Sequence, residues 1–413
     1  MATSCDMLPE DVVYHILLWL PVVSLLRFKS VCKAWCSIIE SSDFITQHLH
    51  LSKSRDNNKM IALTSKMLDF EGGPIFTLRF MLLSGNNFQM TESLDLPHRF
   101  DHRIEPRGML VSCNGLICLV HRFYDHTIED EVSLWNPATK QFRILPKSAV
   151  PIPVWDGGLV DFYYGFGFDN KTNDYKVVRI IHDDYILDGN QQSRVRVEVY
   201  SLNMDSWRVL DVVLPIDIHI ASDPRTPYRD GIYCWSGWDS FMENGSVIYR
   251  NSILSFDFTK EVFGTMPMPD VYSFVRGSLV RCSLKLALLR ENIACFEWVR
   301  DPPKTDNWHC KIWVLNEYGV KESWTKLYTV VLESRAFSKF ISLNGMIIWL
   351  KWDRLTRNFS FRVCNPITQE LMDLPFDQLD SNQDLLFANY KESCVSVHSA
   401  YCAASRVSAV VDV

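Results

Sequence analysis

The sequence contains few side chains whose types and spacing could bind a metal ion. His98 and His102 lie four residues apart with Asp101 between them, and two imidazoles at this spacing would share one face of a helix. However, Pro97 and the nearby arginines favour a loop, and no cysteine or further ligand follows closely. We therefore predict ordinary surface histidines here and no metal site.

The patterns that could support catalysis are incomplete. Gly165 and Gly167 form a Gly-x-Gly pair, but the third glycine and the following helix of a dinucleotide-binding loop are missing. The chain has no Gly-x-x-x-x-Gly-Lys-Ser/Thr loop and no Gly-x-Ser-x-Gly elbow. Asp183 and Asp184 are typical of a solvated turn rather than of an acid–base pair. We expect no catalytic residue, no cofactor and no enzymatic activity.

Composition narrows the classes of partner. The 413 residues include 42 Lys and Arg against 49 Asp and Glu, which gives a net charge of −7. This balance argues against a nucleic-acid partner, which usually requires a strongly basic face. Apolar stretches such as residues 277–289 are interrupted by charges and fall short of the ~20 residues of a membrane span. We therefore expect neither nucleic acid nor a membrane as partner.

The cysteines and the amino-terminal residues indicate a reducing compartment. The 12 cysteines are scattered, without a Cys-x-x-Cys pair, and the first ten residues lack the basic and apolar regions of a secretory signal. Free thiols that act as small core residues are expected under these conditions. The predicted location is the cytoplasm or the nucleus.

The first fifty residues are typical of a small helical domain. A helix is expected to begin at Pro9, because proline suits the first helical position and Glu10 and Asp11 then lie near the positive end of the dipole. Pro21 ends this helix, two more helices follow, and Asp43 could cap a fourth. Helices this short cannot bury all their apolar side chains among themselves. The domain either packs on the rest of the chain or keeps one face for a partner.

The helical domain carries the pattern Leu8-Pro9-x-Asp11-Val12-x-x-x-Ile16-Leu17-x-x-Leu20-Pro21-x-x-x-Leu25, followed by Val31-Cys32-Lys33-x-Trp35. This pattern resembles an F-box. The resemblance implies docking on a Skp-type adaptor, which is attached to a cullin scaffold in a ubiquitin ligase. Carried over by position, the docking residues are Leu8, Pro9, Leu17, Leu20, Pro21, Leu25, Val31, Cys32 and Trp35. Leu17 and Leu25 could equally be internal packing residues, and Val23 stands where plant members usually carry Lys.

Beyond residue 55 the sequence changes to short alternating runs that repeat. Residues 133–146 predict a strand, a turn and a strand, and residues 363–375 repeat the pattern about 230 residues later. The pairs Asn114-Gly115 and Asn344-Gly345 recur with nearly the same offset, and Asn-Gly suits a tight hairpin. Weaker copies over 199–210, 254–266 and 312–327 give a period of about 57 residues, near the ~50 of kelch-like blades.

The repeat predicts a closed ring of strands. We expect strands over 60–64 and 75–83 to pair with carboxy-terminal strands near 385–387 and 394–397, because closure removes exposed sheet edges. The predicted fold is a three- to four-helix domain followed by a kelch-like β-propeller of about six blades. A two-sheet sandwich is the alternative, which an even repeat disfavours. The expected domains are a helical domain over 1–50, a linker over 51–58, the propeller over 59–400 and a flexible tail over 401–413.

The predicted propeller carries further motifs that it shares with a known family. The strings Gly165-Phe166-Gly167-Phe168-Asp169, residues 173–179 and residues 312–326 are similar to plant F-box-associated domains. Within that family, the pollen S-locus F-box group is closest in layout. The resemblance implies that the propeller binds a protein target.

The tryptophans fall into two sets. Four occupy repeat positions and are expected in the core, namely Trp135, Trp207, Trp313 and Trp324. Five fall in the longer predicted connections and are candidate target-binding residues, because loops on a rigid scaffold often carry recognition and exposed aromatics anchor interfaces. These are Trp155, Trp238, Trp298, Trp308 and Trp352. Alternatively, they plug the ends of the blades.

The leading hypothesis is a substrate-recognition subunit of an SCF-type cullin-RING ubiquitin ligase, in which the helical domain binds a Skp-type adaptor and the propeller binds a protein substrate. One alternative is a pollen S-locus F-box protein that recognises pistil ribonucleases. Another is an F-box scaffold that acts outside ligases. A propeller hydrolase or oxidase is a third, and it would need convergent acids, or Cys and Tyr with His ligands, which the sequence does not offer at the repeat positions.

Overall fold

The computed structural model describes most of the chain. The described residues are 8–54, 59–70, 73–85, 88–94, 104–105, 110–123, 130–151, 159–187, 190–215, 219–220, 227–269, 274–275, 283–289, 292–300, 308–332, 336–343, 345–353, 358–374 and 383–398. Trp155, His98, His102 and the predicted tail over 401–413 lie outside these residues. Among the described residues, no helix is both long enough and apolar enough to cross a membrane.

Four helices form the amino-terminal domain, which we call the head. They are α1 (Glu10–Leu18), α2 (Val22–Phe28), α3 (Lys33–Glu40) and α4 (Ser42–Ser54). The first helix begins one residue later than predicted, because Pro9 is its N-cap rather than its first residue. Pro21 lies beyond the end of α1, as predicted, and is also the N-cap of α2. The cap of α4 differs from the prediction, because the Ser41 hydroxyl, not Asp43, accepts from the Phe44 N–H at 3.3 Å. The helix also runs four residues into the predicted linker.

The head has its own small core, to which each helix contributes. The fully buried apolar members are Leu17, Leu18, Val22, Leu25, Ile39 and Phe44. Tyr14 packs edge-on against Phe44 with ring centroids 5.4 Å apart. Two polar contacts join the helices at the rim: the Tyr14 hydroxyl donates to Asp43 at 3.1 Å, and Lys29 pairs with Glu40 at 3.1 Å.

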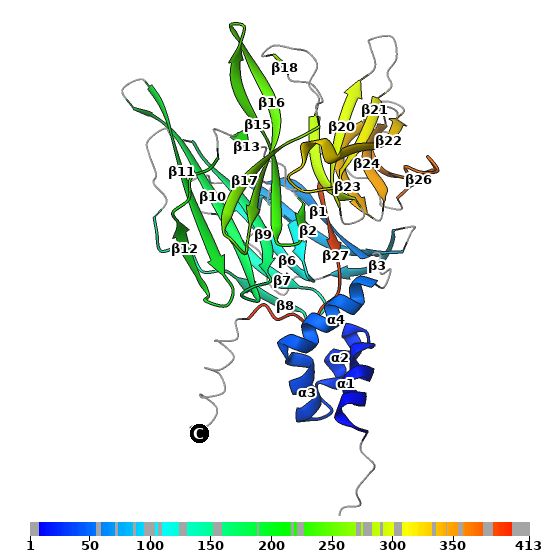
Figure 1. The fold of residues 1–413 in the computed structure, drawn as a ribbon. Coiled ribbons are helices and arrows are strands. Elements are labelled where there is room, and N and C mark those ends of the chain that lie inside the picture. The colour runs from blue at the N-terminus through cyan, green and yellow to red at the C-terminus, as the bar shows by residue number, and fades with distance from the viewer. Residues whose placement is uncertain are drawn as a thin grey trace, which may run out of the picture.

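The described strands form six sheets, which are the blades of a β-propeller (Figure 1). The first blade contains β27 (Gln383–Tyr390), β1 (Lys59–Phe70), β2 (Gly73–Ser84) and β3 (Gln89–Leu94). The second contains β4 (Ile104–Glu105), β5 (Leu110–Cys113), β6 (Leu116–Phe123), β7 (Glu131–Asn136) and β8 (Gln141–Ile144). The third contains β9 (Leu159–Asp169), β10 (Asp174–Leu187), β11 (Asn190–Ser201) and β12 (Ser206–Leu210).

The other three sheets complete the ring. The fourth blade contains β13 (His219–Ile220), β14 (Tyr228–Arg229), β15 (Ile232–Glu243), β16 (Ser246–Asp257), β17 (Val262–Pro267) and β18 (Phe274–Val275). The fifth contains β19 (Ser283–Leu289), β20 (Asn292–Arg300), β21 (Trp308–Leu315) and β22 (Trp324–Leu332), with a 3-10 turn η1 (Lys321–Ser323). The sixth contains β23 (Ala336–Leu343), β24 (Met346–Asp353), β25 (Asn358–Cys364) and β26 (Leu371–Asp373). Neighbouring strands pair antiparallel throughout the described ladders.

The ring closes as predicted, but with one carboxy-terminal strand rather than two. β27 pairs with β1, with Leu63 opposite Leu386 and Ala62 opposite Phe387. Residues 394–397, predicted to be a strand, form no ladder and run as irregular chain beneath the propeller. Their contacts are with the head and with the second blade, which explains why an apolar run here needs no strand partner.

The repeated turns are confirmed and share their backbone geometry. Asn136 and Asn365 each accept hydrogen bonds through Oδ1 from the N–H groups two and three residues later. Lys140 and Gln369 follow at the same offset and both have a φ of 58°. This agreement between the second and sixth blades shows that the two segments are copies of one strand–turn–strand unit.

The Gly-x-Gly pair is a packing motif between two blades, not part of a nucleotide-binding loop. A Cβ added to Gly165 would lie 2.8 Å from both Trp235 and Tyr233, and one added to Gly167 would lie 2.3 Å from the Phe258 ring. Only glycine lets β9 approach the aromatic side chains of the next blade this closely.

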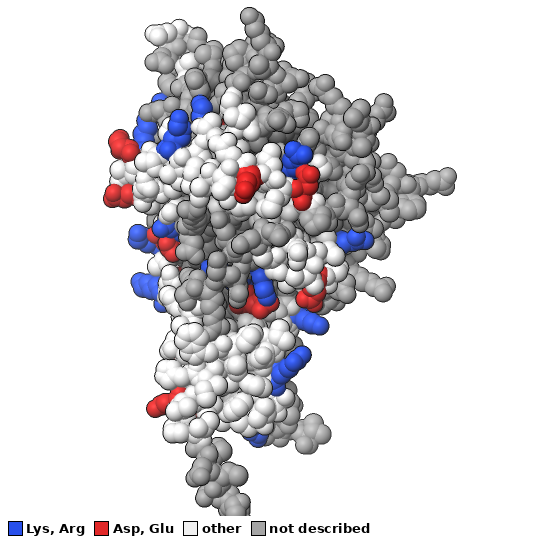
Figure 2. Space-filling model, turned by 90° about the vertical axis from the view of Figure 1, so that its right-hand side faces the viewer, with Lys and Arg blue, Asp and Glu red and all other residues white. Residues whose placement is uncertain are grey.

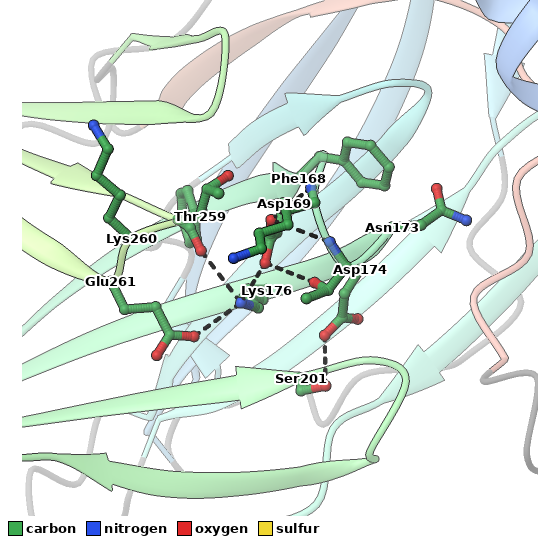
Figure 3. A network of polar contacts seen from close by, with 12 residues as sticks. Phe168, Asp169, Asn173, Asp174, Lys176, Ser201, Thr259, Lys260 and Glu261 are labelled. Atoms are coloured by element: carbon green, nitrogen blue, oxygen red, sulfur yellow. Dashed lines mark hydrogen bonds and ion pairs between the residues drawn. The ribbon is translucent and has the colours of Figure 1, made fainter.

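A buried polar network joins the same two blades next to this motif (Figure 3). Lys176 on β10 donates to Asp169 at 2.7 Å, to the Phe258 carbonyl at 3.2 Å and to Glu261 at 2.8 Å. Burial raises the pKa of Asp169, but hydrogen bonds from Lys176, Thr172 and a backbone N–H outweigh it and hold that pKa well below its ordinary value. The network is therefore a charged staple between neighbouring blades.

The four tryptophans predicted for the core all contact it, but they are buried to different extents. Trp135 is 1% and Trp324 is 8% exposed, whereas Trp207 and Trp313 are half-buried and pack on the edges of two clusters. The described cysteines are free, as predicted, and most are buried among apolar side chains. Burial raises the pKa of Cys234 to about 12, so this thiol stays protonated and inert.

Candidate partner-binding surface

A row of exposed apolar side chains lies along one face of α1. Val12, Ile16 and Trp19 recur at the spacing of successive helical turns, and 41%, 48% and 62% of their surfaces are exposed. Leu8 precedes this row and Val23, at the start of α2, continues it. We call these five residues the α1 stripe. Polar residues normally occupy the solvent face of a helix, so the α1 stripe has the character of a binding surface.

The start of α3 adds a second exposed apolar region. Val31 is 59% exposed, and Cys32 follows it as the N-cap of α3. The Cys32 thiol accepts from the Trp35 N–H at 3.5 Å, so the exposed sulfur also fixes the local backbone. Trp35 itself is half-buried and packs against Phe28 with ring centroids 5.4 Å apart.

The structure separates the nine predicted docking residues into two groups. Leu8, Pro9, Pro21, Val31 and Cys32 are exposed. Leu17 is 1% and Leu25 is 0% exposed, so both are core residues of the head and cannot contact a partner directly. Leu20 and Trp35 are half-buried and pack on the same core. The expectation that Leu17 and Leu25 dock is therefore corrected to the packing role.

Sequence reasoning missed four members of the α1 stripe as docking candidates, namely Val12, Ile16, Trp19 and Val23. Their signal was present, because the spacing of Val12, Ile16 and Trp19 is that of one helix face. The motif instead drew attention to Leu17 and Leu20, which lie on the opposite, inward face. A helix with apolar residues on two faces does not reveal in sequence which face is inside.

The position of the stripe leaves it open to a partner. Figure 1 shows α4 between the propeller and the other helices, so α1 and α2 lie on the distal side of the head. On the side of the head that Figure 2 shows, charged residues lie mainly at the margins of an uncharged area. Depletion of charged residues at the centre is a feature of protein–protein interfaces.

Four of the five predicted target-binding tryptophans are on strands rather than in connections, and Trp155 lies outside the described residues. Trp238 lies on β15 and is half-buried, while Trp298, Trp308 and Trp352 occupy positions on β20, β21 and β24. The strands are longer than their repeat spacing suggested, because hairpins such as β10–β11 and β15–β16 extend far beyond the ring (Figure 1). The backbone positions of Trp298 and Trp308 are near the end of the hairpin at which β20 connects to β21.

Other buried charges belong to the blades. Arg179 on β10 pairs with Glu198 on β11 at 2.5 Å, and Lys311 on β21 pairs with Glu297 on β20 at 3.2 Å. In each blade the two residues stand directly opposite each other on the second and third strands, with the sign of the charges exchanged. Such pairs fix strand register. Among the described residues, no group of three or more His, Cys, Asp or Glu is placed to hold a metal ion.

Comparison with known proteins identifies both regions. A profile of the F-box domain matches residues 5–47, and a profile of the F-box associated beta propeller domain matches residues 74–397. The F-box protein CPR1 of Arabidopsis thaliana is 27% identical over 332 residues, which cover 78% of this chain and 73% of that protein. An F-box/kelch-repeat protein of the same plant is 27% identical over 335 residues, covering 78% and 79%.

Proposed function

Because the chain belongs to the F-box proteins that carry an F-box associated β-propeller domain, we propose that it is the substrate-recognition subunit of an SCF-type cullin-RING ubiquitin ligase. The head binds a Skp-type adaptor and, through it, the cullin. The propeller binds the protein to be ubiquitinated. The observation that carries the proposal is the α1 stripe, an apolar surface that the chain itself leaves exposed.

The stripe has the properties that a stable adaptor interface needs. Leu8, Ile16 and Trp19 are large and exposed, and α1 is anchored by Leu17 and Leu18 in the core of the head. Burial of such side chains at the centre of an interface supplies most of its binding energy, with tryptophan the most frequent contributor. A rigid helix loses little conformational freedom on binding.

The target is proposed to bind at the end of the propeller that lies opposite the head. Long hairpins such as β10–β11 and β15–β16 project from that end (Figure 1). The candidate residues Trp155, Trp238, Trp298, Trp308 and Trp352 remain a prediction for this contact.

The proposed activity is recruitment rather than bond chemistry. Holding the target beside a ubiquitin-loaded partner makes ubiquitin transfer effectively intramolecular, which raises its rate without a catalytic group in this chain. Membership of the S-locus group and recognition of a pistil ribonuclease stay predictions, as does the location in the cytoplasm or the nucleus.

The test is direct binding of the purified full-length protein to a Skp-type adaptor. Ile16→Glu places a charge in the centre of the stripe and should weaken binding at least tenfold. Val209→Glu is the matched control, because Val209 is 46% exposed on β12 of the propeller, outside the α1 stripe, and its substitution should leave adaptor binding unchanged. Wild-type protein that fails to bind any Skp-type adaptor, or equal binding by Ile16→Glu, would refute the proposal.

A further inference from the structure

Residues 391–398 follow the last strand and run between the propeller and the head. Although they form no helix or strand, four of the eight are buried: Ser393 and Val397 are 0% exposed, and Cys394 and Val395 are 5% and 6% exposed. Figure 1 shows this segment passing beneath β8 and beside α4. An irregular segment is rarely buried unless its polar backbone groups find partners.

Side chains of the second blade supply those partners. The Asn136 amide donates to the Ser393 carbonyl at 3.1 Å and to the Val395 carbonyl at 2.7 Å, and Asn136 is itself fully buried. Gln141 accepts from the Val397 N–H at 3.2 Å. At the start of the segment, Lys59 of β1 pairs with Glu392.

The apolar side chains of the segment point to two different cores. Val395 and Val397 belong to the cluster formed by the second to fourth blades, and Cys394 belongs to the core of the head. Ile45 of α4 packs on both clusters, and Ala138, from the turn after β7, packs on the head. The segment therefore makes the two cores continuous.

We propose that residues 391–398 form a clasp that locks the head onto the propeller in one orientation, with Asn136 as the residue that holds the clasp closed. Neighbouring domains of one chain usually move relative to each other unless a large apolar interface joins them. Here Cys394 supplies part of that interface only while the Asn136 amide fixes the backbone on both sides of it. Resting on the proposed function, the clasp would set the direction from the adaptor to the target, which governs how often ubiquitin reaches the target.

The repeat offers a matched pair of variants. In Asn136→Asp, the remaining acceptor oxygen can keep the turn to Ala138, but the amide donor is replaced by an oxygen that faces two carbonyls. Asn365 forms the same turn in the sixth blade, and no hydrogen bond from its amide to the clasp is found among the described residues. Asn365→Asp therefore repeats the change without the clasp.

The expected result is measured by hydrogen exchange on the full-length protein. The amides of Val395 and Val397, and then those of α2 and α3, should exchange roughly tenfold or more faster in Asn136→Asp than in wild type. Asn365→Asp should match wild type at these amides. Small-angle X-ray scattering should show a larger maximum dimension for Asn136→Asp alone. Equal exchange in the two variants would overturn the clasp.

A second pair of variants tests the clasp even if the Asn136→Asp protein does not fold. Gly115 and Gly245 both end two-residue Asn-Gly turns, with φ values of 83° and 76°. A Cβ on Gly115 would lie 2.6 Å from the Lys391 carbonyl oxygen and 2.3 Å from the Ser393 hydroxyl, whereas one on Gly245 meets nothing within 4 Å. Both alanine variants carry the same backbone strain, so only Gly115→Ala should open the clasp.

The same preparations separate the clasp from the proposed function. If wild type does not bind a Skp-type adaptor, the ligase role fails while the exchange comparison still stands. If adaptor binding is normal but Gly115→Ala and Gly245→Ala show equal exchange over residues 391–398, the clasp is wrong and the ligase role remains.

Discussion

At the scale of single residues, neighbours in the head have opposite roles. Trp19 is 62% exposed at the end of α1, and Leu25 is 0% exposed on α2. The F-box pattern includes Leu25 but leaves the position of Trp19 unspecified. Leu25, the fixed position, packs in the core that all four helices share, whereas Trp19, the variable position, is exposed and is proposed to bind the adaptor.

This division predicts opposite effects of two substitutions. Trp19→Ala should weaken adaptor binding by about 2 kcal/mol with little change in the unfolding free energy. Leu25→Ala should lower the unfolding free energy by about 2–4 kcal/mol, because it leaves a cavity in a small core. Isothermal titration calorimetry and chemical denaturation measure the two quantities. A Trp19→Ala protein that unfolds as easily as Leu25→Ala would contradict the assignment.

At the scale of elements, the contact between neighbouring blades depends on a charged staple. Asp169 and Lys176 belong to one blade and Glu261 to the next. Burial raises the pKa of Glu261, but hydrogen bonds from Arg208 and Lys176 outweigh it and lower that pKa below its ordinary value. Both carboxylates therefore contribute stability that requires their ionised forms.

The staple predicts a pH-dependent effect of Asp169→Asn. Because the folded-state pKa of Asp169 is lowered, its contribution is fully present above the unfolded-state pKa of about 4 and is lost as pH falls below it. The variant should be less stable than wild type by about 2 kcal/mol at pH 7, and this difference should shrink below about pH 4. Urea denaturation between pH 3 and pH 7 measures this difference in unfolding free energy. The range extends about one unit below and three units above the unfolded-state pKa of Asp169.

A matched turn provides the control for this prediction. Asp257 accepts from two backbone N–H groups at the β16–β17 turn, as Asp169 does at the β9–β10 turn, but its partner Lys260 is 75% exposed. A solvent-exposed pair contributes little. Asp257→Asn should therefore lower the unfolding free energy by less than about 1 kcal/mol. An effect as large as that of Asp169→Asn would show that the turn, not the charged staple, supplies the stability.

At the scale of the whole molecule, one strand from the end of the chain completes the first blade. Phe387 on β27 is 4% exposed and packs edge-on against Phe361 of the sixth blade, with ring centroids 5.9 Å apart. The same strand pairs with β1. The residue thus joins the two ends of the ring, and its loss should loosen both blades together.

Closure predicts that Phe387→Ala lowers the unfolding free energy by about 3–5 kcal/mol and accelerates exchange in β1 as well as β27. Asn389 lies two residues along the same strand and is exposed, so Asn389→Ala should change stability by less than about 0.5 kcal/mol. Unaltered exchange in β1 of the Phe387→Ala protein would show that the ring does not depend on this strand.

Sequence alone determined the features that follow from local rules. Pro9 marked the start of the first helix to within one residue, Pro21 marked the break after it, and Asn136 and Asn365 fixed the repeated turns, because proline and asparagine constrain their own backbone. Two repeat markers in phase were enough to predict a closed ring, of whose two predicted closing strands the one near 385–387 forms and the one near 394–397 does not.

The tertiary structure decided which sides of these elements meet. It placed the α1 stripe outside and Leu25 inside, used Gly165 and Gly167 for packing between blades, and brought residues 391–398 between two cores as irregular chain. None of these features follows from the sequence. A helix with apolar residues on two faces can pack by either face, and an apolar run without a period is compatible with several folds. Only contacts between residues far apart in the chain distinguish those arrangements.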